Sequence, residues 1–267
     1  MLESLRSHWP EYLMEGAELG IFMIVAGIFS TLFYAPASPA VATISNLFLR
    51  GLLMGSVMGL TAIAVIYSPW GKRSGAHFNP AVTLAFYRLG KLEFWDTCFY
   101  VLAQFIGGSL GILTATLILG DPFKNLPVNY IVTVPGIGGW FAAFSAEVVL
   151  AFILMLMILV ISNHSTLHHY TGIFAGVLVA IFVTLAAPIS GMSINPARTF
   201  ASALPANVWT AVWIYFVAPP FAMLVAAETY LRRTRSQSED LCGKLCPNVE
   251  TRCICTNCPC MDDPSLG

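Results

Sequence analysis

Hydrophobic residues fall into six long runs along the chain, and polar segments separate each run from the next. Each run holds roughly 18 residues or more, which is long enough for a helix to cross the ~30 Å hydrocarbon core of a bilayer. The runs span about residues 17–34, 51–70, 97–119, 140–162, 171–189 and 208–227. The pattern predicts an all-α polytopic membrane protein with six transmembrane helices. We expect the first span to be retained and not cleaved as a signal peptide.

A ten-residue motif occurs twice, after the second run and after the fifth. Residues 74–83 and residues 190–199 both fit the pattern Ser-Gly-x-x-x-Asn-Pro-Ala-x-Thr. Asn is a favoured helix N-cap, and Pro suits the first helical position because its φ is fixed and its missing N–H would be unpaired there. Each motif therefore predicts the start of a helix. The residues at these starts are Asn79, Pro80, Ala81, Asn195, Pro196 and Ala197.

The helices predicted after the motifs are short. One runs from Pro80 to about Leu89, and the other runs from Pro196 to Leu204, where Pro205 is expected to end it. About ten residues rise roughly 15 Å, which is half of the hydrocarbon thickness. Three spans lie between equivalent points of the two copies, so the pattern predicts an inverted repeat whose half-helices enter from opposite faces. Irregular backbone at this depth needs protein or water beside it, so we expect a water-filled cavity there.

Composition and charge agree with a membrane protein. Hydrophobic residues make up 57% of the chain and charged residues 10%, whereas soluble domains carry about 25% charged residues. If both termini lie on one side, that side holds 10 of the 13 Lys and Arg residues, and Arg50, Lys124 and Arg198 are the exceptions. This bias predicts cytoplasmic termini, and we expect the plasma (inner) membrane. The basic residues form no cluster typical of nucleic-acid binding.

Two acidic residues occupy equivalent places near the starts of the first and fourth runs. They are Glu18 and Glu147. Because an ionisable group inside a membrane is costly, each needs a role. A carboxylate can accept hydrogen bonds from N–H groups of a loop that enters the membrane without helical pairing. We therefore expect Glu18 and Glu147 to brace the two loops, and Glu15 to lie at the interface.

The two motifs also predict a particular electrostatic environment. Half-helices that meet by their N-termini direct two partial positive charges of about 0.5 each at one point. The side-chain amides of Asn79 and Asn195 can donate to a passing oxygen there, whereas cations and protons are repelled. Arg198 stands where the first copy has Val82, and it adds a charge and five donors. This chemistry favours a path for neutral hydroxylic solutes.

The two Asn-Pro-Ala motifs, the six runs and the Ser74-Gly75-Ala76-His77 sequence closely resemble the major intrinsic proteins, the aquaporins and aquaglyceroporins. The resemblance covers residues 11–230, with repeats at about 11–120 and 135–230. It implies a homotetramer in the lipid bilayer with one pore per subunit and passive conduction. In this comparison Asn79 and Asn195 match the central pair of the family, and Arg198 matches its constriction arginine. The resemblance leaves residues 1–10 as a cytoplasmic N-terminus and 231–267 as a cytoplasmic Cys-rich tail.

Three positions are similar to the water-conducting branch of that family. They are Thr199 after the arginine, Ala203 four residues further on, and the aromatic pair Tyr215-Phe216 in the last run. These positions predict a channel for water that also admits small neutral solutes and excludes protons and ions.

The remaining filter positions, which the resemblance also assigns, are less typical of a water channel. They are Met192, Val183 and either Gly59 or Met58. Val183 replaces the His usual in water-selective members, so the filter is expected to be more apolar and wider. A facilitator for glycerol or ammonia therefore remains one alternative. An ion-coupled secondary transporter is another, because broken helices at the midplane also build substrate sites. No motif of a serine hydrolase or zinc protease is present, so no enzyme activity is expected.

The tail contains six closely spaced cysteines: Cys242, Cys246, Cys253, Cys255, Cys258 and Cys260. Such clusters in cytosolic segments often bind soft metals, so Zn²⁺, Cu⁺ or an iron–sulfur cluster is one hypothesis. A redox-sensitive or lipidated tail and a tail without function are the alternatives. The channel itself is expected to need no cofactor.

Overall fold

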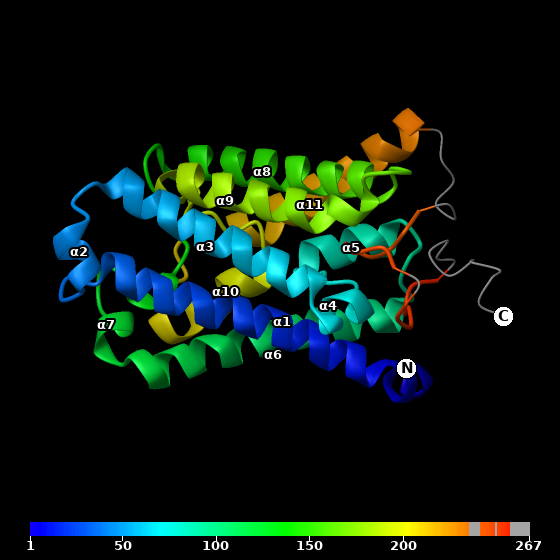
Figure 1. Ribbon diagram of the computed structural model, residues 1–267, viewed down its shortest axis with the longest axis horizontal. Helices are drawn as coiled ribbons and strands as arrows, with labels where there is room; N and C mark the ends of the chain where they lie inside the picture. Colours follow the sequence, from blue (N-terminus) through cyan, green and yellow to red (C-terminus); the bar gives the residue numbers. More distant parts are fainter. Residues whose placement is uncertain (235–240, 249, 257–267) are drawn as a thin grey trace.

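Six long helices form the body of the protein. The computed structural model describes residues 1–234, 241–248 and 250–256, and every regular element within these ranges is helical. The long helices are α1 (Leu2–Tyr34), α3 (Leu47–Tyr67), α6 (Phe94–Leu119), α8 (Gly139–Ser162), α9 (Thr171–Ser190) and α11 (Val212–Thr234). Each is long and apolar enough to cross a membrane, so the predicted all-α fold with six spans is confirmed. Figure 1 shows them lying roughly along the long axis of the molecule.

Two short helices occupy the interior of this bundle. They are α5 (Pro80–Arg88) and α10 (Pro196–Ala206), and both begin at the predicted proline. From near the middle of the molecule they extend toward opposite ends (Figure 1). Further short helices connect the spans: α2 (Pro39–Thr43), α4 (Pro69–Ser74), α7 (Asp121–Lys124) and the 3₁₀ turns η1 (Asn129–Ile131) and η2 (His168–Tyr170).

The expected stop at Pro205 is wrong. Helix α10 continues to Ala206, and it ends at Asn207, which has a φ of +51° and whose N–H bonds to carbonyls of the last turn. Pro205 therefore lies inside the last turn, one residue before the helix ends.

Close contacts between helix backbones occur both within the first repeat and between the two repeats. A Cβ added to Gly107 of α6 would lie only 1.9 Å from the carbonyl oxygen of Gly16 in α1. A Cβ on Gly176 of α9 would likewise lie 2.5 Å from the carbonyl oxygen of Gly59 in α3. Small residues at such crossings let helices approach closely where lipid offers no hydrophobic driving force.

Helix α1 begins at Leu2, well before the predicted first run. Its extra turns carry Glu11 and Glu15, and both side chains are fully buried. Glu11 pairs with Arg73 at 2.9 Å, and Glu15 accepts hydrogen bonds from the loop before α5. The expected interfacial position of Glu15 is therefore wrong. A hydropathy pattern predicts only which residues contact lipid. These two carboxylates are buried inside the protein, where they have hydrogen-bond and ion-pair partners.

Candidate functional site

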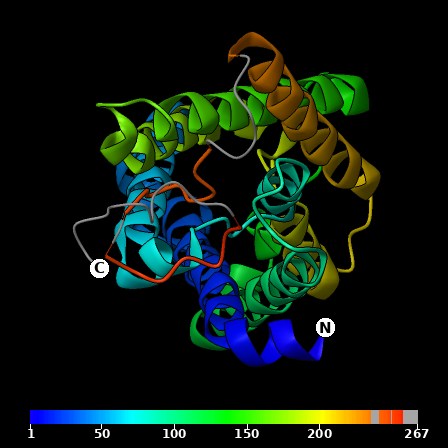
Figure 2. The same cartoon turned by 90° about the vertical axis from the view of Figure 1, so that its right-hand side faces the viewer.

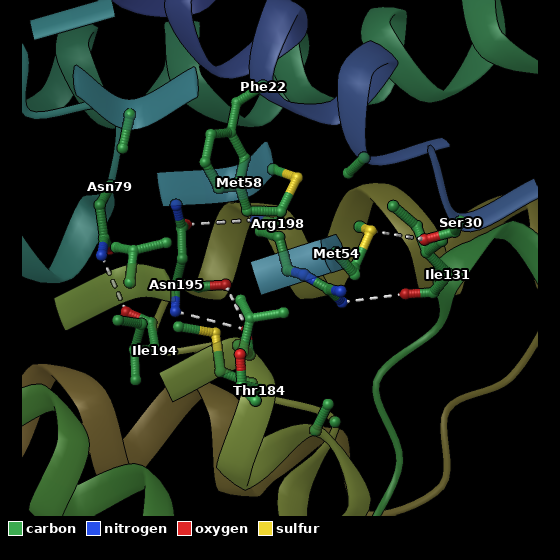
Figure 3. A pocket seen from close by; sticks show the side chains of 18 of the residues that line it. Phe22, Ser30, Met54, Met58, Asn79, Ile131, Thr184, Ile194, Asn195 and Arg198 are labelled. Carbon is green, nitrogen blue, oxygen red and sulfur yellow. Dashed lines mark hydrogen bonds between the residues drawn. The ribbon is translucent and has the colours of Figure 1, made fainter. Parts of the chain in front are cut away.

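The two half-helices are joined through the asparagines that start them. Asn79 Nδ2 donates to the carbonyl of Ile194 at 2.8 Å, and Asn195 Nδ2 donates to the carbonyl of Phe78 at 2.9 Å. Each amide thus spans from one repeat to the other (Figure 3). Since an amide nitrogen carries two hydrogens, one donor of each asparagine is left over from this contact. Both side chains line the same cavity.

The oxygen atoms of the same amides start the helices. Asn79 Oδ1 accepts from the N–H of Ala81 at 2.9 Å, and Asn195 Oδ1 accepts from the N–H groups of Ala197 and Arg198 at 3.0 and 3.2 Å. Because the cap fixes each Oδ1 on the helix, the Nδ2 group is oriented away from it. The prolines and alanines that follow, Pro80, Ala81, Pro196 and Ala197, are buried in the first turns.

Glu147 braces the second loop. Its carboxylate accepts from the Ser190 hydroxyl at 2.7 Å and from the N–H groups of Ser193 and Ile194 at 2.9 and 2.6 Å. These N–H groups belong to extended chain and would otherwise be unpaired in the interior. The bonds hold the backbone that presents Asn195.

The first loop divides this task between two acids. Glu15 accepts from the N–H groups of His77 and Phe78 at 2.9 and 2.7 Å, whereas Glu18 accepts only the hydroxyl of Ser74, at 2.8 Å. The expectation that Glu18 pairs with the loop backbone is therefore corrected to Glu15. Both positions lie on one face of α1 because a three-residue step keeps side chains together.

A pair of tyrosines completes the symmetry of the loops. Tyr100 donates its hydroxyl to the carbonyl of Ser74 at 2.7 Å, and Tyr215 donates to the carbonyl of Ser190 at 2.6 Å. Both rings are fully buried. Tyr215, which resemblance associates with water channels, thus contacts the outer side of the loop backbone and is absent from the cavity lining.

A cavity of about 650 Å³ is lined by both asparagines. Three long helices line it with stripes of residues four positions apart, which keeps the side chains near one helix face. The stripes are Phe22, Ala26, Ser30 and Tyr34 from α1, Met54, Met58, Ala62 and Ile66 from α3, and Ala175, Val179, Val183 and Ala187 from α9. The sequence reasoning did not identify the α1 stripe or Met54, although their spacing is visible in the sequence.

Arg198 is fixed at one end of this cavity. Its Nη1 donates to the carbonyl of Ile131, the last residue of η1, at 3.0 Å. Figure 3 shows the guanidinium pointing toward Ile131, on the same side of the asparagines as Met54 and Ser30. Four further N–H donors of the guanidinium are left for other partners. A fixed cation at this place opposes the entry of other cations.

Three of the four other predicted filter residues line the cavity, and one does not. Val183, Met192 and Met58 are in the lining, whereas Gly59 faces α9. A Cβ on Gly59 would lie 2.4 Å from the carbonyl oxygen of Gly176, so this residue serves helix packing. Of the two alternatives on α3, Met58 is therefore the one that reaches the lumen, because one residue along a helix turns the side chain by about 100°.

Polar groups are sparse along the cavity. The described lining includes Arg198 and His77 as its only Arg, Lys or His side chains, and it includes no Asp or Glu. Its hydrogen-bonding side chains otherwise are Ser30, Tyr34, Asn79, Thr184, Ser193 and Asn195. A lumen without a carboxylate has no group to carry a coupling cation through the midplane. The arrangement suits neutral solutes.

The cysteines of the tail are only partly described. Within the described segments, no three His, Cys, Asp or Glu side chains gather in a way that could hold a metal. This finding covers Cys242, Cys246, Cys253 and Cys255, while Cys258 and Cys260 lie outside the described residues. The soft-metal hypothesis stays a prediction.

Comparison with known proteins agrees with this geometry. The family described as "Major intrinsic protein" matches residues 9–230. "Aquaporin NIP1-1" from Zea mays is 34% identical over 212 residues, covering 78% of this chain and 73% of its own. "Aquaporin NIP1-1" from Arabidopsis thaliana is 35% identical over 178 residues, covering 65% of this chain and 60% of its own. The solved aquaglyceroporin from Plasmodium falciparum has the same fold, with a TM-score of 0.68, 20% identity, and coverage of 84% of this chain and 96% of its own. The chain belongs to the major intrinsic protein family, and it is a passive multi-pass membrane channel for water or small solutes and not an enzyme.

Proposed function

We propose that this channel conducts water, admits small neutral solutes more slowly, and excludes protons and ions. The observation that carries the proposal is the pair of amide donors, Asn79 and Asn195, at the junction of two helix N-termini. A water molecule at this point accepts hydrogen bonds from the amides. The positive ends of α5 and α10, together with Arg198, oppose a cation or an excess proton at the same place.

Glycerol or ammonia is the second candidate for the main solute. The observation in its favour is the apolar character of the filter, where Val183, Met192 and Met54 lie in the same lining as Arg198. Valine offers no hydrogen bond to water and occupies less space than histidine. An alkyl backbone such as that of glycerol can pack against these side chains while its hydroxyls face the arginine.

For the assembly, we propose a homotetramer in the plasma (inner) membrane with cytoplasmic termini. The distribution of Lys and Arg supports the orientation. Large apolar side chains stay exposed along α6, among them Leu102, Ile106, Leu110, Leu113 and Leu117. Such a face requires lipid or a neighbouring subunit to cover it.

Stopped-flow light scattering on proteoliposomes tests the solute preference. In a gradient of an impermeant osmolyte, the liposomes should shrink faster than protein-free liposomes. In a glycerol gradient, re-swelling should be much slower than shrinkage. Val183→His adds bulk and a donor, so it should slow glycerol re-swelling while water flux persists. Re-swelling as fast as shrinkage in the wild type would instead assign the channel to glycerol.

A further inference from the structure

The segment that follows α11 returns to the bundle and covers one end of it. Residues 241–248 and 250–256 lie at the end where α1 begins and α11 stops, and Figure 2 shows this red segment crossing between the helices. Leu241, Leu245 and Cys246 are at most 6% exposed. Side chains of a tail are buried to this degree only where they pack against the rest of the protein.

Two main-chain contacts attach the segment to the loop that precedes α5. The N–H of Leu245 donates to the carbonyl of Gly75 at 3.0 Å. The carbonyl of Gly243 lies 3.0 Å from His77 Nε2, which must donate because a carbonyl only accepts. The other ring nitrogen of His77 lies 3.3 Å from the hydroxyl of Thr83. His77 therefore links the tail directly to the first pore loop.

A buried lysine forms a second attachment. Lys244 is fully buried, and its Nζ donates to the carbonyl of Lys72 in α4 at 2.9 Å and to the Thr251 hydroxyl at 3.2 Å. The same carbonyl also accepts from Asn248 Nδ2 at 3.0 Å. An ammonium group without such acceptors would be costly to bury, so these bonds fix the segment on α4.

Further contacts reach the other sides of the opening. The N–H of Cys242 donates to Asn163 Oδ1 at the end of α8, at 2.9 Å. The N–H of Thr256 donates to the carbonyl of Lys91 between α5 and α6, at 3.0 Å. The segment is thus held at α4, at α8 and near α5, and it spans the opening from one side to the other.

The side chain of Leu245 reaches the pore itself. It lines the same cavity as His77, Asn79, Leu154 and Ile158, and it is 3% exposed. Water crosses a narrow channel by exchanging hydrogen bonds, and a leucine side chain offers none. With Leu245 in this place, an apolar side chain lines this end of the cavity.

We propose that residues 241–248 and 250–256 form an autoinhibitory plug, which places Leu245 in the pore and must leave for full conduction. The inference rests on the proposed channel function. The seated and released states are in equilibrium, and a released fraction of about a tenth or less leaves a small basal flux.

The plug also couples the pore to thiol chemistry. Cys246 is 6% exposed in the seat, so a thiol-reactive compound or a soft metal ion gains access to its sulfur when the segment leaves. By reciprocity, a ligand that binds only the released state holds the pore open. The tail thus becomes a sensor for thiol-reactive or soft-metal ligands, with opening as its response.

Two substitutions in the full chain test the plug. Gly243→Val should unseat it, because a Cβ at this residue would lie 2.5 Å from Cys255 Sγ, and Leu245→Ala should remove the apolar group. Each should raise the osmotic water permeability of proteoliposomes roughly tenfold over the wild type if the released fraction is about a tenth. Arg252→Ala is the matched control, since its side chain is exposed, and it should match the wild type.

The outcomes separate the plug from the channel function. Equal, high permeability in the wild type and both tail variants would overturn the plug and leave the channel intact. No permeability in any variant would overturn both. N-ethylmaleimide gives a second readout, because it should raise the permeability of the wild type and of a chain in which Cys246 is the only tail cysteine left, and have no such effect once Cys246 is also changed to serine. An unchanged wild-type flux after complete alkylation of Cys246 would contradict the proposal.

Discussion

The three buried acids near the pore loops should differ sharply when each is changed to glutamine. In Glu147→Gln one carboxylate oxygen becomes an NH₂ group, which cannot accept from the N–H of Ser193 or Ile194. A buried N–H without an acceptor costs about 1–3 kcal/mol. Glu15→Gln likewise removes the acceptor for the N–H of His77 or Phe78. A penalty of this size shifts the equilibrium between the native and a displaced loop by about 5–150-fold.

Glu18→Gln is the matched comparison. Its only hydrogen bond in the described structure comes from the Ser74 hydroxyl, and the remaining oxygen has no partner there. The amide oxygen of glutamine can accept that hydroxyl, so the effect should be smaller than that of either other variant. The assay is the monodisperse fraction that survives heating in detergent, followed by osmotic permeability. A Glu18→Gln variant as damaged as Glu147→Gln, or an unaffected Glu147→Gln, would refute this account of the loops.

Three further outcomes follow from the structure. Gly107→Leu should prevent α1 and α6 from packing and abolish a stable, monodisperse protein, whereas Gly51→Ala, whose added Cβ would lie 3.9 Å from the nearest atom, should keep it; size-exclusion chromatography decides this. Arg198→Val, which copies the first motif, should raise glycerol uptake and cation conductance of liposomes, and unchanged conductance would argue against a cation barrier. Burial raises the pKa of the Cys246 thiol, so its alkylation rate should keep rising with pH beyond the point where an exposed cysteine levels off, and mass spectrometry of labelled peptides measures it.

The sequence was sufficient where local pattern determines structure. Continuous apolar runs predicted the six spans, and the Asn-Pro pair predicted where α5 and α10 begin. It was insufficient where the register of a helix matters. Gly59 and Met58 are neighbours in sequence, but one faces α9 and the other faces the lumen. The prediction that Glu18 would bind the loop backbone, where the structure has Glu15, failed for the same reason. Both residues lie on one face of α1, and only the position of the loop distinguishes them.

The place where the tail packs on the bundle could not be predicted from the sequence pattern. Its cysteine spacing suggested metal binding, while its contacts with the described chain join residues far apart in sequence, such as Gly243 with His77. No periodicity encodes a main-chain carbonyl as the partner of a histidine. The bond of His77 to the tail is a tertiary contact that appears only when the whole chain is folded.

The most direct test of the account is the rate of osmotic shrinkage of proteoliposomes containing the wild type or Asn195→Asp at equal protein content. The aspartate keeps an oxygen to cap α10 but loses the Nδ2 donor that contacts the Phe78 carbonyl and faces the lumen. The account predicts shrinkage faster than in protein-free liposomes for the wild type and a marked loss of this rate in the variant. A variant that conducts water as fast as the wild type would contradict the claim that the paired asparagines form the conduction path.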